Sequence, residues 1–136
     1  MRSFRSDYNF GLQNEERVMP VLERTFNENF EKTDKYHPLD FKGRGCWVEV
    51  KTRTFEVNKF DTTMLPYSKI EYAKKCANSV YFVFVFTDGI YYILYDQEVF
   101  SKFSVNVFKR TNRTDHVDTA QNYIYIPTQL LTKIEC

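Results

Sequence analysis

Val80–Phe86 is an almost wholly apolar run rich in Val, Phe and Tyr, the residue types enriched in β-strands. A strand of this composition has no polar face, so it belongs at the centre of a sheet with both faces covered. Thr87–Gly89 is a turn signal, and the apolar run Ile90–Tyr95 follows it as a hairpin partner. Together with the short run Tyr123–Ile126, these segments predict a domain built around a buried β-sheet.

Helices and a second hairpin are predicted before this strand. Apolar residues recur at helical spacing from Leu12 to Phe26, where Pro20 marks either a kink or a later helix start. Pro66–Ala77 has the pattern of another helix, with proline at its start. Between them, Pro38–Phe41 and Cys46–Lys51 are short strands joined by a turn. This order places a mixed sheet between helices.

Length and composition indicate one domain spanning residues 1–136. Of its residues 43% are hydrophobic and 18% are aromatic, which is enough for a core without disulfides or a structural metal. No repeat or Pro/Gly-rich linker divides the chain. The net charge is only +1, so a nucleic acid would have to be bound by a local basic patch.

Cysteine usage and the N-terminus indicate a cytoplasmic, reducing environment. Cys46, Cys76 and Cys136 are far apart and form no CxxC pair, which argues against a disulfide framework and a zinc site. The N-terminus has no apolar signal segment, and the longest apolar run is too short to cross a membrane. We therefore expect a protein that is neither secreted nor bound to a membrane.

Asp40, Glu49 and Lys51 are the strongest candidates for chemistry. Side chains alternate along a strand, so Glu49 and Lys51 point to the same face, and Asp40 on the paired strand can reach that face. Two neighbouring carboxylates form a hard-oxygen site for Mg²⁺ or Mn²⁺. A lysine beside the ion can orient a water or help to deprotonate it. The alternative interpretations are a turn residue for Asp40 and an exposed ion pair for Glu49 and Lys51.

At these residues the sequence resembles the PD-(D/E)XK nuclease superfamily, which includes restriction endonucleases and junction resolvases. Pro38–Asp40 matches the PD half with one inserted residue, and Glu49–Lys51 matches the ExK half. The elements follow the family's α-β-β-α-β order, so the resemblance covers roughly Gly11 to Tyr95. It implies an α/β, restriction-endonuclease-like fold in which helices flank a mixed sheet.

The resemblance also implies further site residues. Similar enzymes often add a first-helix glutamate to the metal shell, and Glu15, at the centre of the apolar stripe, is preferred to Glu16 at its edge. An ordinary solvated acid is the alternative for Glu15. The backbone carbonyl of Val50 would add a ligand, and Lys69 on the second helix would approach the phosphate unless it is simply solvated. His37 could also line the site.

Local basic residues favour a phosphate-bearing partner. They would contact backbone phosphates without reading sequence, although any one of them can equally be a solvated charge. Outside the ExK motif itself they are Lys42, Arg44, Arg53, Lys69, Lys109, Arg110 and Arg113.

The function expected from these residues is metal-dependent hydrolysis of DNA by a small nuclease that recognises DNA structure rather than a long sequence. Such an enzyme suits DNA repair or recombination in a phage or virus, and resolution of four-way junctions would require a homodimer. The alternatives are a non-catalytic nucleic-acid-binding or scaffolding module of the same fold, a nuclease acting on RNA, and an unrelated α/β binding protein with an accidental motif.

Overall fold

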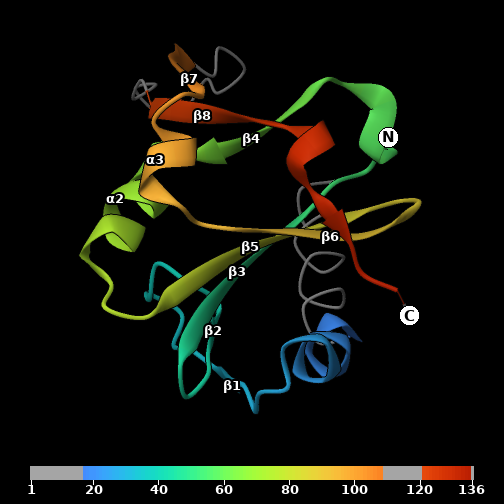
Figure 1. Cartoon of the computed structure of the whole chain (residues 1–136), viewed down its shortest axis with the longest axis vertical. Helices are drawn as coiled ribbons and strands as arrows, with labels where there is room; N and C mark the ends of the chain where they lie inside the picture. Colours follow the sequence, from blue (N-terminus) through green and yellow to red (C-terminus); the bar gives the residue numbers. More distant parts are fainter. Residues whose placement is uncertain (1–16, 109–120, 136) are drawn as a thin grey trace, which may run out of the picture.

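The strand predicted to be central lies in the interior of the larger sheet. The computed structural model describes residues 17–108 and 121–135. There β5 (Ser79–Phe86) pairs in parallel with β3 (Cys46–Thr52) and antiparallel with β6 (Gly89–Leu94) (Figure 1). The sheet order is β1-β2-β3-β5-β6-β9. Val83 and Phe84 point to opposite faces and are both fully buried, which confirms the predicted burial.

The predicted hairpin is present, but its first strand differs from the predicted Pro38–Phe41. β2 (Phe41–Lys42) pairs antiparallel with β3, residues 38–40 are bends, and the Gly43 N–H closes the turn on the Cys46 carbonyl at 2.8 Å. The short strand β1 (Glu31–Lys32) extends the sheet beyond β2. Because β3 and β5 are parallel, the chain between them must cross over, and it does so through a strand and the helix α2 (Tyr67–Lys75).

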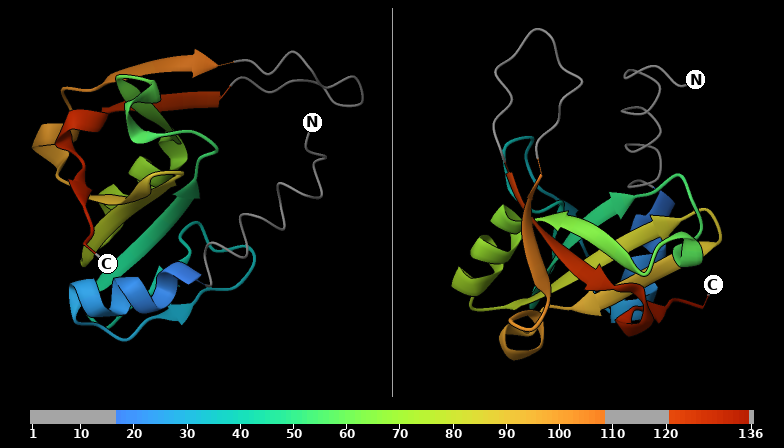
Figure 2. Two further views of the ribbon diagram at one scale, coloured as in Figure 1. Left: turned by 90° about the vertical axis from the view of Figure 1, so that its right-hand side faces the viewer. Right: turned by 90° about the horizontal axis from the view of Figure 1, so that it is seen from above.

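Different layers cover the two faces of this sheet. The helical segment 17–26 contributes Val18 and Leu22 to one core, against Val48 and Val50 of β3. On the other face, α2 and a second sheet pack over β5, and Figure 2 shows this second sheet on the side away from the N-terminal helix. The residues of β3 that alternate with Val48 and Val50 therefore face the space between the sheet and α2.

The second sheet is the main difference from the sequence interpretation, which predicted one sheet. It consists of β4 (Thr62–Pro66), β7 (Ser104–Phe108) and β8 (Gln121–Pro127), in the order β4-β8-β7. β4 lies in the polar segment between the two predicted strands and the predicted helix at Pro66–Ala77, where the sequence predicted no strand. It forms a strand because Thr63 and Leu65 point into the core, at 3% and 0% exposure.

The remaining elements are short. They are the 3₁₀ turns η1 (Val57–Lys59) and η2 (Thr128–Leu130), the helix α3 (Gln97–Phe100) and the edge strand β9 (Thr132–Lys133). The architecture is a mixed α/β fold with the restriction-endonuclease-like order: the helix at 17–26, β2, β3, α2 and β5. No helix among the described residues is long and apolar enough to span a membrane.

Gly43 gives a stability test of the hairpin. A Cβ there would lie 2.5 Å from the Glu28 side chain and 3.0 Å from the Phe30 ring. Glu28 cannot move away freely, because its carboxylate accepts the backbone N–H groups of Arg44 and Gly45. We expect Gly43→Ala to lower the free energy of unfolding by about 1–3 kcal/mol, measured by urea denaturation.

Gly45→Ala is the matched control for this prediction. A Cβ at Gly45 meets no atom within 4 Å, so the substitution should leave stability unchanged or raise it slightly by restricting the unfolded chain. Equal stabilities of the two variants would show that the contact between Gly43 and Glu28 is not tight.

Candidate active site

Glu49 is a buried carboxylate in the middle of β3. Its neighbours Val48 and Val50 face the core on the helix 17–26 side, so its own side chain points to the α2 side. Only 2% of its surface is exposed. Lys51 lies two residues further along on the same face and is partly exposed, so it connects the buried carboxylate with the solvent.

Asp40 is fixed beside Glu49 by contacts with the backbone of β3. It directly precedes β2; its N–H donates to the Val48 carbonyl at 3.0 Å, and its Oδ2 accepts the Val50 N–H at 2.8 Å. The Asp40 carboxylate thus accepts a β3 N–H that a backbone carbonyl of a neighbouring strand would otherwise accept. Asp40 and Glu49 are close enough for the charge of one to act on the other.

Two lysines converge on one oxygen of Glu49. Lys69 Nζ lies 3.1 Å from Oε2 and Lys51 Nζ lies 3.5 Å from the same atom. Lys69 also donates a hydrogen bond to the Pro38 carbonyl, which ties α2 to the segment before β2. The other carboxylate oxygen, Oε1, is buried and has no hydrogen-bond partner within the described residues.

The surroundings shift the ionisation of Glu49 strongly. Burial, followed by the neighbouring Asp40 carboxylate, raises its pKa from 4.5 to about 8, although Lys51 and Lys69 act in the opposite direction. Without a further positive charge, the site therefore favours the protonated form at neutral pH. A carboxylate held in this way, beside a second carboxylate, is poised to bind a cation.

The donor set fits a hard divalent cation. A buried, unpartnered oxygen of Glu49 next to the Asp40 carboxylate offers the oxygen ligands that Mg²⁺ and Mn²⁺ accept. Within residues 17–108 and 121–135, no three His, Cys, Asp or Glu side chains gather into a metal-binding group. Two carboxylates suffice for Mg²⁺, because this ion commonly keeps waters and substrate phosphate oxygens as its other ligands.

An aromatic cluster borders the carboxylates, and the sequence interpretation did not identify it. The His37 ring stacks on Trp47 with centroids 4.8 Å apart, and its Nε2 lies 3.2 Å from the Tyr72 hydroxyl. Its Nδ1 lies 3.1 Å from the Leu39 backbone N and carbonyl O. Lys42 lies over the outer part of the cluster, 5.4 Å from the centroid of a Trp47 ring. His37 is therefore close to the site but held by structural contacts.

The other predicted basic residues lie in different surroundings. Lys42 and Arg44 are exposed at the β2–β3 turn, at the opposite end of β3 from Lys51. Arg53, in contrast, is largely covered: its Nε donates to Thr63 Oγ1 at 3.2 Å and one terminal nitrogen donates to the Met64 carbonyl. Glu15, Glu16, Lys109, Arg110 and Arg113 lie outside the described residues.

The comparison with family models agrees with this geometry. Residues 4–134 match the family described as "Phage putative PDDEXK endonuclease". No curated protein and no solved structure matches the chain. The match covers nearly the whole sequence, including both acidic residues and the lysine of the motif. By this match and by the arrangement of Asp40, Glu49 and Lys51, the chain belongs to the phage PDDEXK endonuclease family.

Proposed function

We propose that the protein hydrolyses DNA phosphodiester bonds in a reaction that depends on Mg²⁺ or Mn²⁺ held by Asp40 and Glu49. The observation that carries this proposal is the buried Glu49 carboxylate, which has one unpartnered oxygen, a second carboxylate beside it and two lysines on its other oxygen. A purely structural carboxylate would be expected to have both oxygens satisfied.

Each side chain has a distinct role in this reaction. A bound divalent ion would supply Lewis-acid stabilisation of the charge that develops on the scissile phosphate. Lys51, the more exposed of the two lysines, positions the attacking water and adds positive charge near the phosphate. Lys69 is more covered and also bonded to Pro38, so it orients Glu49 and the segment that carries Asp40. In-line attack leaves a 5′-phosphate.

Two further ligands belong to the proposal. The Val50 carbonyl lies on β3 directly between Glu49 and Lys51, and the resemblance to PD-(D/E)XK nucleases makes it an additional oxygen donor. Glu15 from the first helix would complete the shell in the same way. These two assignments rest on the family's pattern, whereas Asp40 and Glu49 rest also on the contacts described above.

Substrate binding is proposed to use backbone phosphates rather than base sequence. Lys42 and Arg44 project from the exposed turn and can bind phosphates beyond the cut site. Lys109, Arg110 and Arg113, which lie outside the described residues, are proposed as further phosphate contacts. We propose recognition of DNA structure and, if four-way junctions are the substrate, a homodimer that makes two cuts.

The proposed function is tested with labelled single-stranded, duplex, flap and four-way-junction DNA incubated with Mg²⁺ or Mn²⁺. We expect cleavage in the presence of either metal ion and no cleavage in EDTA. Asp40→Asn should lower the rate by at least about 10²-fold and remove the heat of Mn²⁺ binding measured by calorimetry. Asp61→Asn changes an exposed carboxylate and should alter neither result.

The test also separates the alternatives. Cleavage of labelled RNA but not DNA would replace the proposed substrate. DNA binding without cleavage by the purified protein would favour the non-catalytic binding module. Failure of the wild-type protein to bind Mn²⁺ would contradict the proposed role of the two carboxylates.

A further inference from the structure

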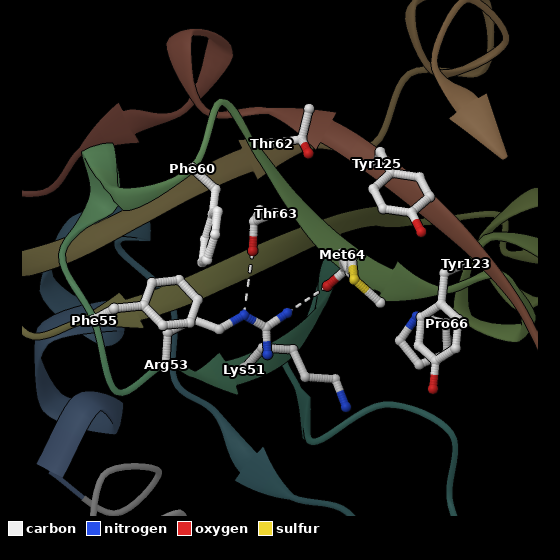
Figure 3. A pocket seen from close by; sticks show the side chains of 10 residues that line it. All are labelled: Lys51, Arg53, Phe55, Phe60, Thr62, Thr63, Met64, Pro66, Tyr123 and Tyr125. Carbon is white, nitrogen blue, oxygen red and sulfur yellow. Dashed lines mark hydrogen bonds between the residues drawn. The ribbon is translucent and has the colours of Figure 1, made fainter. Parts of the chain in front are cut away.

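A pocket of about 510 Å³ adjoins the candidate active site and has aromatic walls. Figure 3 shows its lining residues: Phe55 and Phe60 come from the chain after β3, and Tyr123 and Tyr125 come from β8. The Phe55 and Phe60 rings meet edge to face with centroids 5.2 Å apart. Phe60 is 53% exposed, so its ring is accessible from the pocket. We call this space the aromatic pocket.

Arg53 gives the aromatic pocket a fixed polar group. Its guanidinium lies 5.7 Å from the centroid of the Phe84 ring, and its bonds to Thr63 and Met64 hold it in place. These bonds use Nε and one terminal nitrogen, while the other terminal nitrogen donates to none of the described residues (Figure 3). The pocket therefore combines flat apolar rings with a cationic donor of fixed orientation.

Lys51 connects the aromatic pocket to the reactive groups. The same side chain lines the pocket and lies 3.5 Å from the Glu49 carboxylate. A group bound in the pocket is thus held next to the position proposed for the scissile phosphate. In a nucleic acid, the group attached next to a phosphate through a sugar is a base.

We infer that the aromatic pocket binds an unpaired nucleobase of the DNA strand next to the phosphate that is cut. This inference rests on the proposed function and adds a substrate class to it: single-stranded, frayed or flapped DNA. Aromatic rings stack on bases of any sequence, and a guanidinium donates to the acceptors on base edges. A base within an intact duplex is stacked and paired, so it enters such a pocket only after it leaves the helix.

The inference is tested by binding, which is measured separately from cleavage. Fluorescence anisotropy in EDTA compares a labelled single strand with a strand of the same length that is abasic throughout, so that the phosphates are unchanged. The wild-type protein is expected to bind the abasic strand about tenfold more weakly. Phe60→Ala should bind the normal strand about tenfold more weakly as well, so that it no longer distinguishes the two strands.

Matched controls exclude a general loss of structure. Phe60 is half exposed, so Phe60→Ala should keep the wild-type melting curve, and Phe60→Leu keeps the apolar volume without the ring. Leu94→Ala removes another exposed apolar side chain, at 44% exposure on β6, and should retain full discrimination between the strands. Duplex binding should be the same for the wild-type protein and Phe60→Ala.

Two outcomes would overturn the inference: equal binding of normal and abasic strands by the wild-type protein, or unchanged discrimination in Phe60→Ala. These outcomes are distinct from failure of the proposed function. If the wild-type protein cleaves DNA in Mg²⁺ but does not distinguish the strands, the nuclease proposal stands and the base pocket does not. If it distinguishes the strands but never cleaves, the pocket stands and the nuclease proposal does not.

Discussion

Lys51→Met is expected to lower the rate of DNA cleavage by about 10³-fold while the protein stays folded and still binds Mn²⁺. The substitution keeps most of the side chain's length and removes its charge. Asp40 and Glu49 remain to bind the ion, and Lys69 remains on Glu49, but the more exposed of the two lysines is lost. The rate is measured in single-turnover cleavage at saturating Mn²⁺, because Lys51 also lowers the pKa of Glu49 and its loss weakens metal binding at a given pH.

The control must separate this effect from a simple loss of positive charge. Lys133→Met removes an exposed lysine on the edge strand β9, which is separated from β3 by β5 and β6. It should leave the rate within about twofold of wild type. Lys69→Met tests the second lysine and should act mainly on metal affinity, because Lys69 contacts Glu49 and Pro38 from a more covered position. If Lys51→Met cleaves at the wild-type rate, Lys51 does not act on the substrate.

The parts of the site that could be predicted are those fixed by local geometry. Alternation along one strand is enough to place Glu49 and Lys51 on a common face, and a seven-residue apolar run is enough to make β5 an interior strand. The turn between β2 and β3 brings Asp40 back to the same strand. All three inferences use separations of about ten residues or fewer.

What could not be predicted depends on contacts between distant segments. The Val50 N–H donates to the side chain Oδ2 of Asp40 instead of to a backbone carbonyl of a neighbouring strand. Secondary-structure propensities of single residues do not predict such a side-chain contact. The ion pair of Lys69 with Glu49 needs the position of α2 over the sheet, which the sequence specifies only through the whole core. Burial of Glu49 follows from the same packing, so the sequence interpretation of an exposed ion pair could not be excluded in advance.

The second sheet and the aromatic pocket were missed for a related reason. β4 contains three polar or proline residues in five, and only its pairing with β8 shows that Thr63 and Leu65 face inwards. The pocket forms where β4 and β8 meet the chain after β3. Phe60 and Tyr125 are therefore neighbours only in the folded protein, and the sequence contains no periodic signal that links them.

Glu49→Gln is expected to stabilise the metal-free protein, and the gain should increase with pH. The pKa of Glu49 is about 8 in the folded protein, against 4.5 for an unperturbed glutamate such as that of the unfolded chain. Between these two pH values the folded protein therefore binds more protons than the unfolded chain. Stability then falls as pH rises through this interval and levels off above pH 8. This is the reverse of the usual behaviour of a paired carboxylate, whose stabilisation is lost as pH falls.

Glutamine mimics the protonated side chain in shape and is not charged at high pH. At about 1.4 kcal/mol for each pKa unit, the shift corresponds to several kcal/mol when Glu49 is fully ionised. The difference in unfolding free energy between Glu49→Gln and wild type should therefore be small near pH 4.5, increase steadily towards pH 8, and then remain constant. Urea denaturation in EDTA at a series of pH values measures it directly.

A matched control and a metal titration connect this stability effect to the site. Glu71→Gln changes an exposed glutamate on α2 and should give the same small difference at every pH. Saturating Mn²⁺ should reduce the decline of wild-type stability with pH, because the ion binds only the ionised carboxylate. The unfolding free energy of Glu49→Gln should be almost the same with and without Mn²⁺. If the difference in unfolding free energy between Glu49→Gln and wild type did not depend on pH, Glu49 would ionise like an exposed glutamate. Its burial would then give no reason to expect cation binding.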